Sequence, residues 1–407
     1  MILHKQVTCA KIFCGKIKED LYTMKVEISD SIKYIGASTY NQDLFEGQYI
    51  IPNGMAYNSY VILDEKIAIM DTADKLVAEE WLENLKTALD GRTPDYLVVQ
   101  HLEPDHSGNI KSVLELYPQI EIVCSAKAKA MMPQFADVDE DKIITKKEGD
   151  TLELGSHTLT FIMAPMVHWP EVMLSYESSE KVLFSADAFG KFGAIDADEG
   201  WSCEARRYYF NIVGKYGAPV QTLLKKAAGL EINTICPLHG PILTDTIPQV
   251  LDLYNTWSSY EPEDEGVFIA YASIHGNTAE AAHKMKEILE AKGCPRVAIA
   301  DLSRDDIAEC VEDAFRHSTL LCMASSYDGG VFAPMADYLH HLKSKAFQNR
   351  KVALVENASW AASAAKAMKA EFEQMKNITF VGDVVTIKTT VKADDIAALE
   401  KLADEIK

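Results

Sequence analysis

The sequence predicts a two-domain α/β protein in which a β-sheet sandwich with outer helices precedes a doubly wound parallel sheet. Short β-like runs, several of them in hairpin-like pairs, fill the chain up to about residue 260. After a polar, acidic, proline-containing segment at 258–266, strands and helices alternate strictly. The length of 407 residues also exceeds what a single hydrophobic core usually serves, which favours two domains.

Composition excludes several classes of function. Apolar residues make up 48% of the chain and charged residues 25%, as in an ordinary soluble globular protein. The formal charge of -21 argues against nucleic acid or an anionic membrane surface as a partner. No apolar run is long enough to span a bilayer, and the first residues lack the apolar segment of a secretory signal. The eight cysteines form no C-x-x-C pair, which indicates a reduced, cytoplasmic protein.

The first 23 residues are predicted to be an N-terminal extension, because "MKVEISDSIKYIG" from Met24 looks like a natural chain start. Cys9 and Cys14, with four residues between them, are interpreted as two unrelated thiols rather than half of a metal site. The predicted organisation is an extension at 1–23, a first domain at 24–260 and a second domain at 261–407.

The first domain is predicted to be a sandwich because its β-like runs are numerous and short. The candidate strand regions are 59–72, 95–100, 120–125, 158–165, 181–187 and 233–240. The run "DTLELGSHTLTFIM" is typical of a hairpin.

In the second domain five strand–helix units follow one another in about 140 residues, which predicts a doubly wound parallel sheet. The expected pairs are 266–272 with 278–293, 296–301 with 304–316, 319–325 with 334–345, 351–357 with 361–375, and a last strand within 378–387 with 392–406.

Three loops at the predicted carboxyl edge of this sheet are typical of a flavin site. The first, "SIHGNT" (273–278), has hydroxyls at both ends and a glycine, which suits a single phosphate at a helix N-terminus. It is neither G-x-G-x-x-G nor a Walker loop, which disfavours a dinucleotide or a nucleoside triphosphate. The loops 325–330 and 356–363 each place a large aromatic residue, Tyr327 and Trp360, among small ones, as two walls around a flat ring.

This arrangement resembles flavodoxin, whose cofactor is FMN, across the C-terminal third of the chain. The predicted cofactor-binding residues are Ser273, Ile274, His275, Gly276, Asn277, Thr278, Ser326, Tyr327, Asp328, Gly329, Gly330, Asn357, Ala358, Ser359, Trp360 and Ala361. Ser325 and Ser326 stand where a proline or threonine is more familiar in flavodoxins.

The stretch "VVQHLEPDHSGN" (98–109) places four potential metal ligands within six residues, directly after an apolar run. They are His101, Glu103, Asp105 and His106. Ligands at this spacing in a loop that follows a strand can be shared between two adjacent ions. The stretch therefore predicts a metal site.

Three further candidate ligands follow other predicted strands: His168, Asp187 and His239. The complete set of four histidines, one glutamate and two aspartates contains no cysteine. Such a mixed N/O set suits two non-haem irons, and it is also compatible with zinc or manganese. One bridging aspartate would give each ion a nearly balanced set and leave open positions for a substrate.

The spacing H-x-E-x-D-H, then 61 residues, His168, then 18 residues, Asp187, and later His239, resembles the flavodiiron proteins (A-type flavoproteins). These place a metallo-β-lactamase-like di-iron domain, an αββα sandwich, before a flavodoxin-like domain, and the resemblance covers about residues 24–407. Related zinc hydrolases carry a histidine where Glu103 stands. The resemblance implies one iron on His101, Glu103 and His168, the other on Asp105, His106 and His239, and Asp187 bridging them. The 51 residues between Asp187 and His239 form a shorter interval than in many members of the family.

A flavin joined to a redox-capable di-metal site predicts a reductase, because hydrolysis needs no flavin. The resemblance implies reduction of O2 to water with four electrons, of NO to N2O with two, or of both. No catalytic residue is predicted beyond the metal ligands. Two alternatives are a zinc hydrolase with an accessory flavodoxin domain and a non-catalytic electron carrier.

The resemblance also implies partners. Since no donor module follows residue 407, we expect electrons from a separate donor: rubredoxin, an NADH-linked relay or, as in some relatives, a reduced deazaflavin. The family's head-to-tail arrangement implies a homodimer or a homotetramer. Segment 46–60 is expected near the metal pocket, where Tyr49, Asn53 and Tyr57 have either a substrate-contacting or a structural role.

Overall fold

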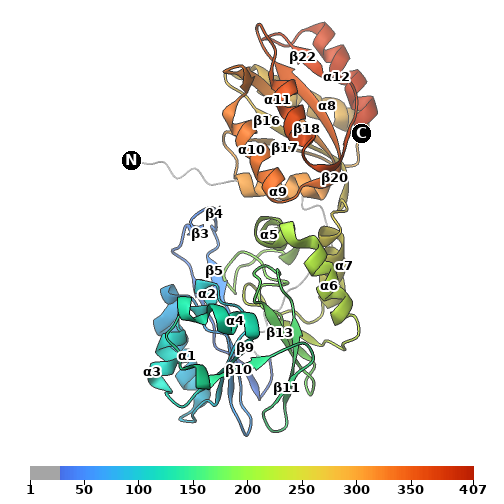
Figure 1. Ribbon diagram of the computed structural model, residues 1–407. Coiled ribbons are helices and arrows are strands. Elements are labelled where there is room, and N and C mark those ends of the chain that lie inside the picture. Colours follow the sequence, from blue (N-terminus) through green and yellow to red (C-terminus); the bar gives the residue numbers. More distant parts are fainter. Residues whose placement is uncertain (1–27) are drawn as a thin grey trace.

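The computed structural model describes residues 28–407 and has two parts, joined by a short linker (Figure 1). The predicted extension at 1–23, with Cys9 and Cys14, lies outside the described residues. Across residues 28–407, no helix is both long and apolar enough to cross a membrane.

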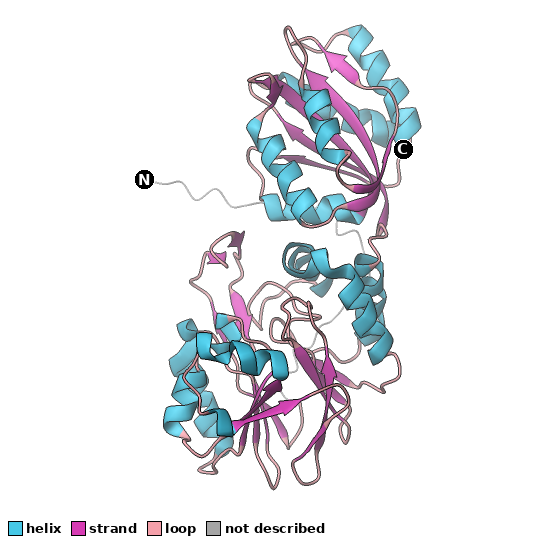
Figure 2. Cartoon of the chain, viewed as in Figure 1, coloured by secondary structure: helices cyan, strands magenta, loops and turns pink. Residues whose placement is uncertain are grey.

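The first part is built on two large sheets that face each other (Figure 2). One sheet has the order β1-β6-β7-β8-β9-β10 and the other the order β11-β12-β13-β14-β15. The strands of the first sheet are β1 (Ile32–Tyr34), β6 (Tyr60–Ile62), β7 (Ala68–Met70), β8 (Tyr96–Val99), β9 (Glu121–Ser125) and β10 (Ile143–Lys146). Those of the second are β11 (Thr151–Glu153), β12 (Thr158–Met163), β13 (Met173–Glu177), β14 (Val182–Phe184) and β15 (Thr234–Cys236). Two small hairpins lie beside them: β2 (Ala37–Thr39) with β5 (Met55–Tyr57), and β3 (Leu44–Phe45) with β4 (Tyr49–Ile50).

Alternate residues of these strands face two different cores. Met70, Val98 and Val123 of the first sheet pack with Phe161 and Phe184 of the second, which forms the core between the sheets. The opposite faces of both sheets pack against helices, so the first part has four layers, α, β, β and α. The predicted sandwich is confirmed.

Seven α-helices and a few short 3-10 and π turns belong to the first part as described. The helices are α1 (Ala78–Leu89), α2 (Pro104–Ser107), α3 (Ile110–Leu116), α4 (Ala126–Met131), α5 (Trp201–Tyr208), α6 (Gly217–Ala227) and α7 (Ile247–Ser258). Helix α1 shows why these segments cover sheets: Trp81, Leu85 and Leu89, spaced four apart, are its buried residues.

The second part is a parallel sheet of order β17-β16-β18-β20-β21, with helices on both faces. Its strands are β16 (Asp264–Ala272), β17 (Val297–Asp301), β18 (His317–Tyr327), β19 (Gly330–Val331), β20 (Gln348–Asn357), β21 (Lys376–Phe380) and β22 (Val385–Ile387). Its helices are α8 (Asn277–Ala291), α9 (Ile307–Arg316), α10 (Ala333–Ser344), α11 (Ala364–Phe372) and α12 (Ala393–Ile406). The helices α8 and α12 pack on one face and α9, α10 and α11 on the other. The predicted doubly wound sheet is confirmed.

Two predicted boundaries in this part are wrong. The acidic linker expected at 258–266 is shorter, because Asp264 already belongs to β16 and receives hydrogen bonds from Arg296 and Arg316. The single last strand expected within 378–387 is two strands, β21 and β22. The chain turns between them at Gly382, where a Cβ atom would come within 2.3 Å of Leu402.

The two parts meet through buried arginines of α5. Arg206 is fully buried, donates two hydrogen bonds of 2.7 Å to Glu263 in the linker and a third, of 3.0 Å, to Glu312 of α9. Arg207 is also buried, and it pairs with Asp306 just before α9 at 3.3 Å. Such a paired, hydrogen-bonded guanidinium is held in one orientation, and it fixes α5 against α9.

At the far end of the sandwich, His157 joins three turns. Its Nδ1 lies 2.6 Å from a carboxylate oxygen of Asp64, and its Nε2 lies 3.1 Å from one of Glu180. Burial opposes the ionisation of Asp64, but hydrogen bonds from the side chain and backbone of His157 outweigh it and lower the pKa of Asp64 to about 2. Burial lowers the pKa of His157, but the two carboxylates outweigh it and raise that pKa.

We predict that Asp64→Asn lowers the free energy of unfolding by about 1.5–3 kcal/mol at pH 6, the usual value of a hydrogen bond to a charged group. The stabilisation from the lowered pKa of Asp64 is present above its unfolded value of about 4 and is lost as pH falls toward 2. The deficit, measured by urea unfolding, should therefore shrink at pH 3. Glu153→Gln, an exposed residue on the β11–β12 hairpin that carries His157, is the control and should cost little at either pH. An equal deficit at both pH values would contradict the assignment.

Candidate metal centre

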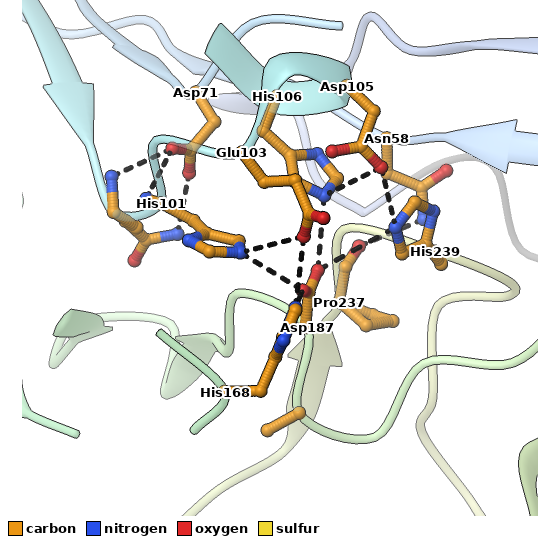
Figure 3. Close-up of polar contacts among 12 residues, drawn as sticks. Asn58, Asp71, His101, Glu103, Asp105, His106, His168, Asp187, Pro237 and His239 are labelled. Atoms are coloured by element: carbon orange, nitrogen blue, oxygen red, sulfur yellow. Dashed lines mark hydrogen bonds and ion pairs between the residues drawn. The ribbon is translucent and has the colours of Figure 1, made fainter. Parts of the chain in front are cut away.

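The seven predicted ligands come together at one edge of the sandwich, where four strands end (Figure 3). The loop after β8 and the short helix α2 supply four of them, and the loops after β12, β14 and β15 supply one each. The four from β8 and α2 are His101, Glu103, Asp105 and His106; the others are His168, Asp187 and His239. Pro104 begins α2, which fixes the turn between Glu103 and Asp105.

The first group consists of His101, Glu103, His168 and Asp187. The Nε2 atoms of His101 and His168 lie 3.2 Å and 3.0 Å from Oε2 of Glu103. The same two nitrogens lie 3.3 Å and 3.0 Å from Oδ2 of Asp187. The four ligand atoms converge on one point.

The second group consists of Asp105, His106 and His239. The Nε2 atoms of His106 and His239 lie 3.4 Å and 3.2 Å from Oδ2 of Asp105. They lie 3.1 Å and 3.7 Å from Oδ1 of Asp187. One oxygen of Asp187 therefore faces each group, so its carboxylate is placed to bridge two ions.

The unpaired polar atoms test whether cations fit here. Both carboxylate oxygens of Asp105 and of Asp187, both ring nitrogens of His106 and Nε2 of His239 are buried without a hydrogen-bond partner among the described residues. Leaving so many buried polar atoms unpaired is costly. Cations between them would supply the missing partners, so the residues fit two ions.

Without cations, the charges in this pocket pull protons onto the imidazoles. Burial opposes protonation of His168, but Asp187 and Glu103 raise its pKa to about 9. Burial raises the pKa of Asp187, but His101 and His106 hold it well below its usual range. Metal ions would replace these protons, so metal binding should weaken as pH falls.

Three interactions behind the ligands were not predicted from the sequence. Glu171 accepts a hydrogen bond from His101 Nδ1 at 2.9 Å, and the carbonyl oxygen of Ala56 lies 2.7 Å from His239 Nδ1. Asp71, at the end of β7, accepts the backbone N–H groups of Gln100 and His101. Two features of the sequence could have indicated these interactions. Glu171 lies three residues after His168, and Asp71 directly follows a buried strand.

Aromatic side chains wall the centre. The rings of Phe45, Tyr57 and Tyr208 lie 5.4 to 5.8 Å from that of His239.

The three residues of segment 46–60 for which a substrate contact was considered all bond other parts of the protein. The Tyr57 hydroxyl donates to Gln42, and the Tyr49 hydroxyl donates to the backbone oxygen of Asn211. The Asn53 amide donates to Glu199. Each of these polar groups therefore has a partner within the protein.

The three loops expected to bind FMN surround one cavity of about 430 Å³ at the carboxyl edge of the parallel sheet. Its lining comprises Ser273, Ile274, His275, Asn277, Thr278, Ser325, Ser326, Tyr327, Asp328, Gly329, Asn357, Ala358, Ser359, Trp360, Ala361, Ser363 and Thr389. Of the predicted residues, Gly276 and Gly330 are not in the lining, and Ser325, Ser363 and Thr389 were not predicted. Gly276 instead shapes the turn before α8, with a positive φ of 92°.

The cavity suits a flat, phosphorylated ligand. The N-terminus of the fifteen-residue helix α8 opens into it beside the Ser273 hydroxyl, which is a favourable place for a phosphate. Trp360 is 82% exposed and Tyr327 50%, so both large rings have uncovered surface at the rim. Stacking on a flat ring would cover that surface.

Comparison with known families and proteins places the chain among oxidoreductases. A model of the ODP family beta lactamase matches residues 55–240. A 33% identical relative from Methanocaldococcus jannaschii, the uncharacterized protein MJ0732, aligns over 69% of this chain and 73% of its own length. The nitric oxide reductase of Moorella thermoacetica is 29% identical over 94% of this chain and 98% of its own length.

Solved structures have the same two-part architecture. The rubredoxin oxygen:oxidoreductase of the anaerobe Desulfovibrio gigas aligns with a TM-score of 0.86 at 27% identity, covering 93% of this chain and 97% of its own. The flavodiiron protein of Giardia intestinalis shares the fold, with a TM-score of 0.84 at 22% identity, covering 93% of this chain and 95% of its own.

We predict that Asp187→Ala lowers the bound metal to less than one ion per chain, because one side chain faces both groups. Elemental analysis of anaerobically purified protein measures this directly. His340→Ala, an exposed histidine on α10, is the matched control and should keep the wild-type content. Full metal content in Asp187→Ala would contradict a bridging position.

Proposed function

The chain belongs to the flavodiiron protein family and is an oxidoreductase, and from this we propose that it reduces O2 to water, NO to N2O, or both. The observation that carries the proposal is the pair of ligand groups joined by Asp187, in a chain that also holds an FMN-sized cavity. The names of the Moorella and Desulfovibrio relatives support NO and O2, respectively, as substrates.

We propose that the seven ligands hold two irons, with Asp187 between them. When bound, the iron pair would supply two electrons and FMN two more, and the irons would leave open positions for a gas. The protein orients the imidazoles through acceptors on their far nitrogens, Glu171 and the Ala56 carbonyl. The aromatic walls on the His239 side exclude water there.

The exposure of the ligands supports one direction of approach. The Glu103 side chain is the most exposed ligand, at 15%, and those of His168 and Asp105 are each 9% exposed. The remaining ligands are at most 1% exposed: His101, His106, Asp187 and His239. Glu103 is thus the ligand that a small molecule from solvent meets first.

We further propose that residues 24–260 form the metal domain and residues 261–407 the FMN domain. The beginning of a new sheet at Asp264 supports this boundary. The three predicted loops that line the cavity would hold FMN, with the phosphate at the start of α8.

The direction of the parallel strands supports a head-to-tail homodimer or homotetramer. Strand β16 starts at the linker, and the cavity lies beyond its other end, nine residues or roughly 30 Å farther on. Such a distance would make electron transfer within one chain slow, so a second copy would bring its FMN to this metal centre.

We propose that electrons reach the FMN from a rubredoxin or another small donor, in the cytoplasm. The name of the Desulfovibrio protein supports rubredoxin as the donor.

The first test measures metal and flavin in anaerobically purified protein, and then consumption of O2 and NO with chemically reduced rubredoxin. We expect about two irons and one FMN per chain and turnover of at least one gas. The ratio of the two rates gives the preferred gas. Zinc in the site with no gas consumption would overturn the proposal and favour hydrolysis.

The dimer is tested by mixing two deficient chains. Asp187→Ala lacks the metal bridge, and Ser273→Asp places a carboxylate where the phosphate would bind, which repels it. Each homodimer should be nearly inactive with reduced rubredoxin. Co-expressed chains, purified as the mixed dimer by two affinity tags, should recover up to about half of the wild-type activity per dimer, because only one of its two sites pairs an FMN with intact metal ligands.

Ser303→Asp, in the loop after β17 and away from the cavity, is the charge-matched control for Ser273→Asp. A mixed dimer as inactive as its parents would show that electrons do not cross between subunits.

A further inference from the structure

The histidines of the two ligand groups differ in what lies behind them. All four imidazoles turn Nε2 toward the centre. Behind His101, Nδ1 donates to Oε1 of Glu171 at 2.9 Å, and behind His239, Nδ1 lies 2.7 Å from the carbonyl oxygen of Ala56. One acceptor is an acidic side chain and the other is a neutral peptide.

Glu171 is held firmly in place. Its residue is 1% exposed, and Oε1 also accepts the backbone N–H of Leu102 at 2.9 Å. Its own backbone oxygen accepts the Ser125 hydroxyl at the end of β9, at 2.8 Å. Glu171 lies in the loop between β12 and β13 that also delivers His168. The same loop therefore serves two histidines of one group.

The two ligand groups are matched in the kinds of ligand and in their formal charge. Each has two imidazoles, one carboxylate of its own and one oxygen of Asp187. Asp71 adds no difference between the imidazoles, because it accepts hydrogen bonds from backbone N–H groups and from the Gln100 side chain and not from a histidine ring. Among the described residues, Nδ1 of His106 has no hydrogen-bond partner.

A carboxylate that accepts the far N–H of a metal-bound histidine makes the imidazole a stronger donor and fixes its orientation. A stronger donor favours the metal ion of higher charge. We propose that Glu171 is a positioning residue that makes the two metal positions unequal: the iron on His101, Glu103 and His168 is bound more tightly and is oxidised first.

The inference rests on the proposed di-iron function. The first oxidation removes one electron from the Fe(II)–Fe(II) pair and passes it to the mediator of a redox titration. It leaves Fe(III) at the His101 position and Fe(II) at the His106 position, and no atom is transferred.

The test is Glu171→Gln, in which the amide oxygen still accepts from His101 and only the charge is lost. With 57Fe-loaded full-length protein, we expect one of the two ferrous Mössbauer signals to change and the other to stay. A ferrous chelator should remove one ion about 10–100-fold more readily, the usual effect of losing such a partner. The midpoint of the first oxidation should rise, and about 59 mV corresponds to a tenfold change in relative affinity.

Glu177→Gln is the matched control, because Glu177 is a fully buried glutamate on β13 that accepts the backbone N–H groups of Ser179 and Glu180. It should behave as the wild type in all three measurements. Glu171→Asp keeps the charge at a longer reach and should give intermediate values. It also provides the same readouts if Glu171→Gln does not fold.

Unchanged chelation, Mössbauer signals and midpoint in the Glu171 variants would overturn the inference, even if the wild type reduces O2 or NO. A wild type that holds two unequal irons but reduces neither gas would overturn the proposed function and leave this inference standing. Equal changes in both ferrous signals would overturn the inference, because Glu171 would then act on the whole centre.

Discussion

The constraint on which this structure depends is the crowding of charge at the edge of the sandwich. The carboxyl groups of Glu103, Asp105 and Asp187 are gathered among four imidazoles, with little solvent to screen them. Buried carboxylates at such distances repel one another unless cations lie between them. Protons on the histidines are one solution and metal ions are the other, and Asp187 turns one oxygen to each ligand group in both cases. The strands that end here hold the ligands in place before any ion arrives, because their cores are packed on both sides.

The same rule of architecture positions both sites. In each part, the loops that leave the ends of neighbouring strands supply the polar groups, and the sheet behind them is rigid and apolar. In the first part, loops from two facing sheets converge, which buries most of the ligands. In the second part, loops from one sheet form an open cavity at its edge, with Trp360 and Tyr327 exposed. A buried centre suits a small gas, and an open cavity suits a planar cofactor that exchanges electrons with other proteins.

Features that depend on residues close in sequence could be predicted, and features that depend on long-range contacts could not. The ligands were visible because each follows a β-like run, and the strand–helix alternation identified the parallel sheet. Glu171 lies 70 residues from His101, so only the fold shows their hydrogen bond. The acidic segment at 258–266 is predicted to be a linker throughout, because sequence alone does not distinguish a solvated glutamate from Glu263 paired with a buried Arg206. The break in the last strand depends on how closely Leu402 approaches Gly382.

The interface between the two parts also shapes the metal pocket. The hairpin of β3 and β4 carries Phe45 onto the His239 ring. Arg207 of α5 donates to the backbone oxygen of Ile50 in β4 at 2.6 Å, and Lys345, which follows α10 in the second part, donates to the Tyr49 hydroxyl at 3.0 Å. The hairpin that places Phe45 beside the metal centre is therefore hydrogen-bonded to Lys345 of the second part. Because Arg207 also pairs with Asp306, a rotation of one part against the other would break the contacts that hold this wall. A fixed orientation of the two parts is what the proposed transfer between a flavin and a metal on different subunits requires, because the distance that electrons cross is then constant.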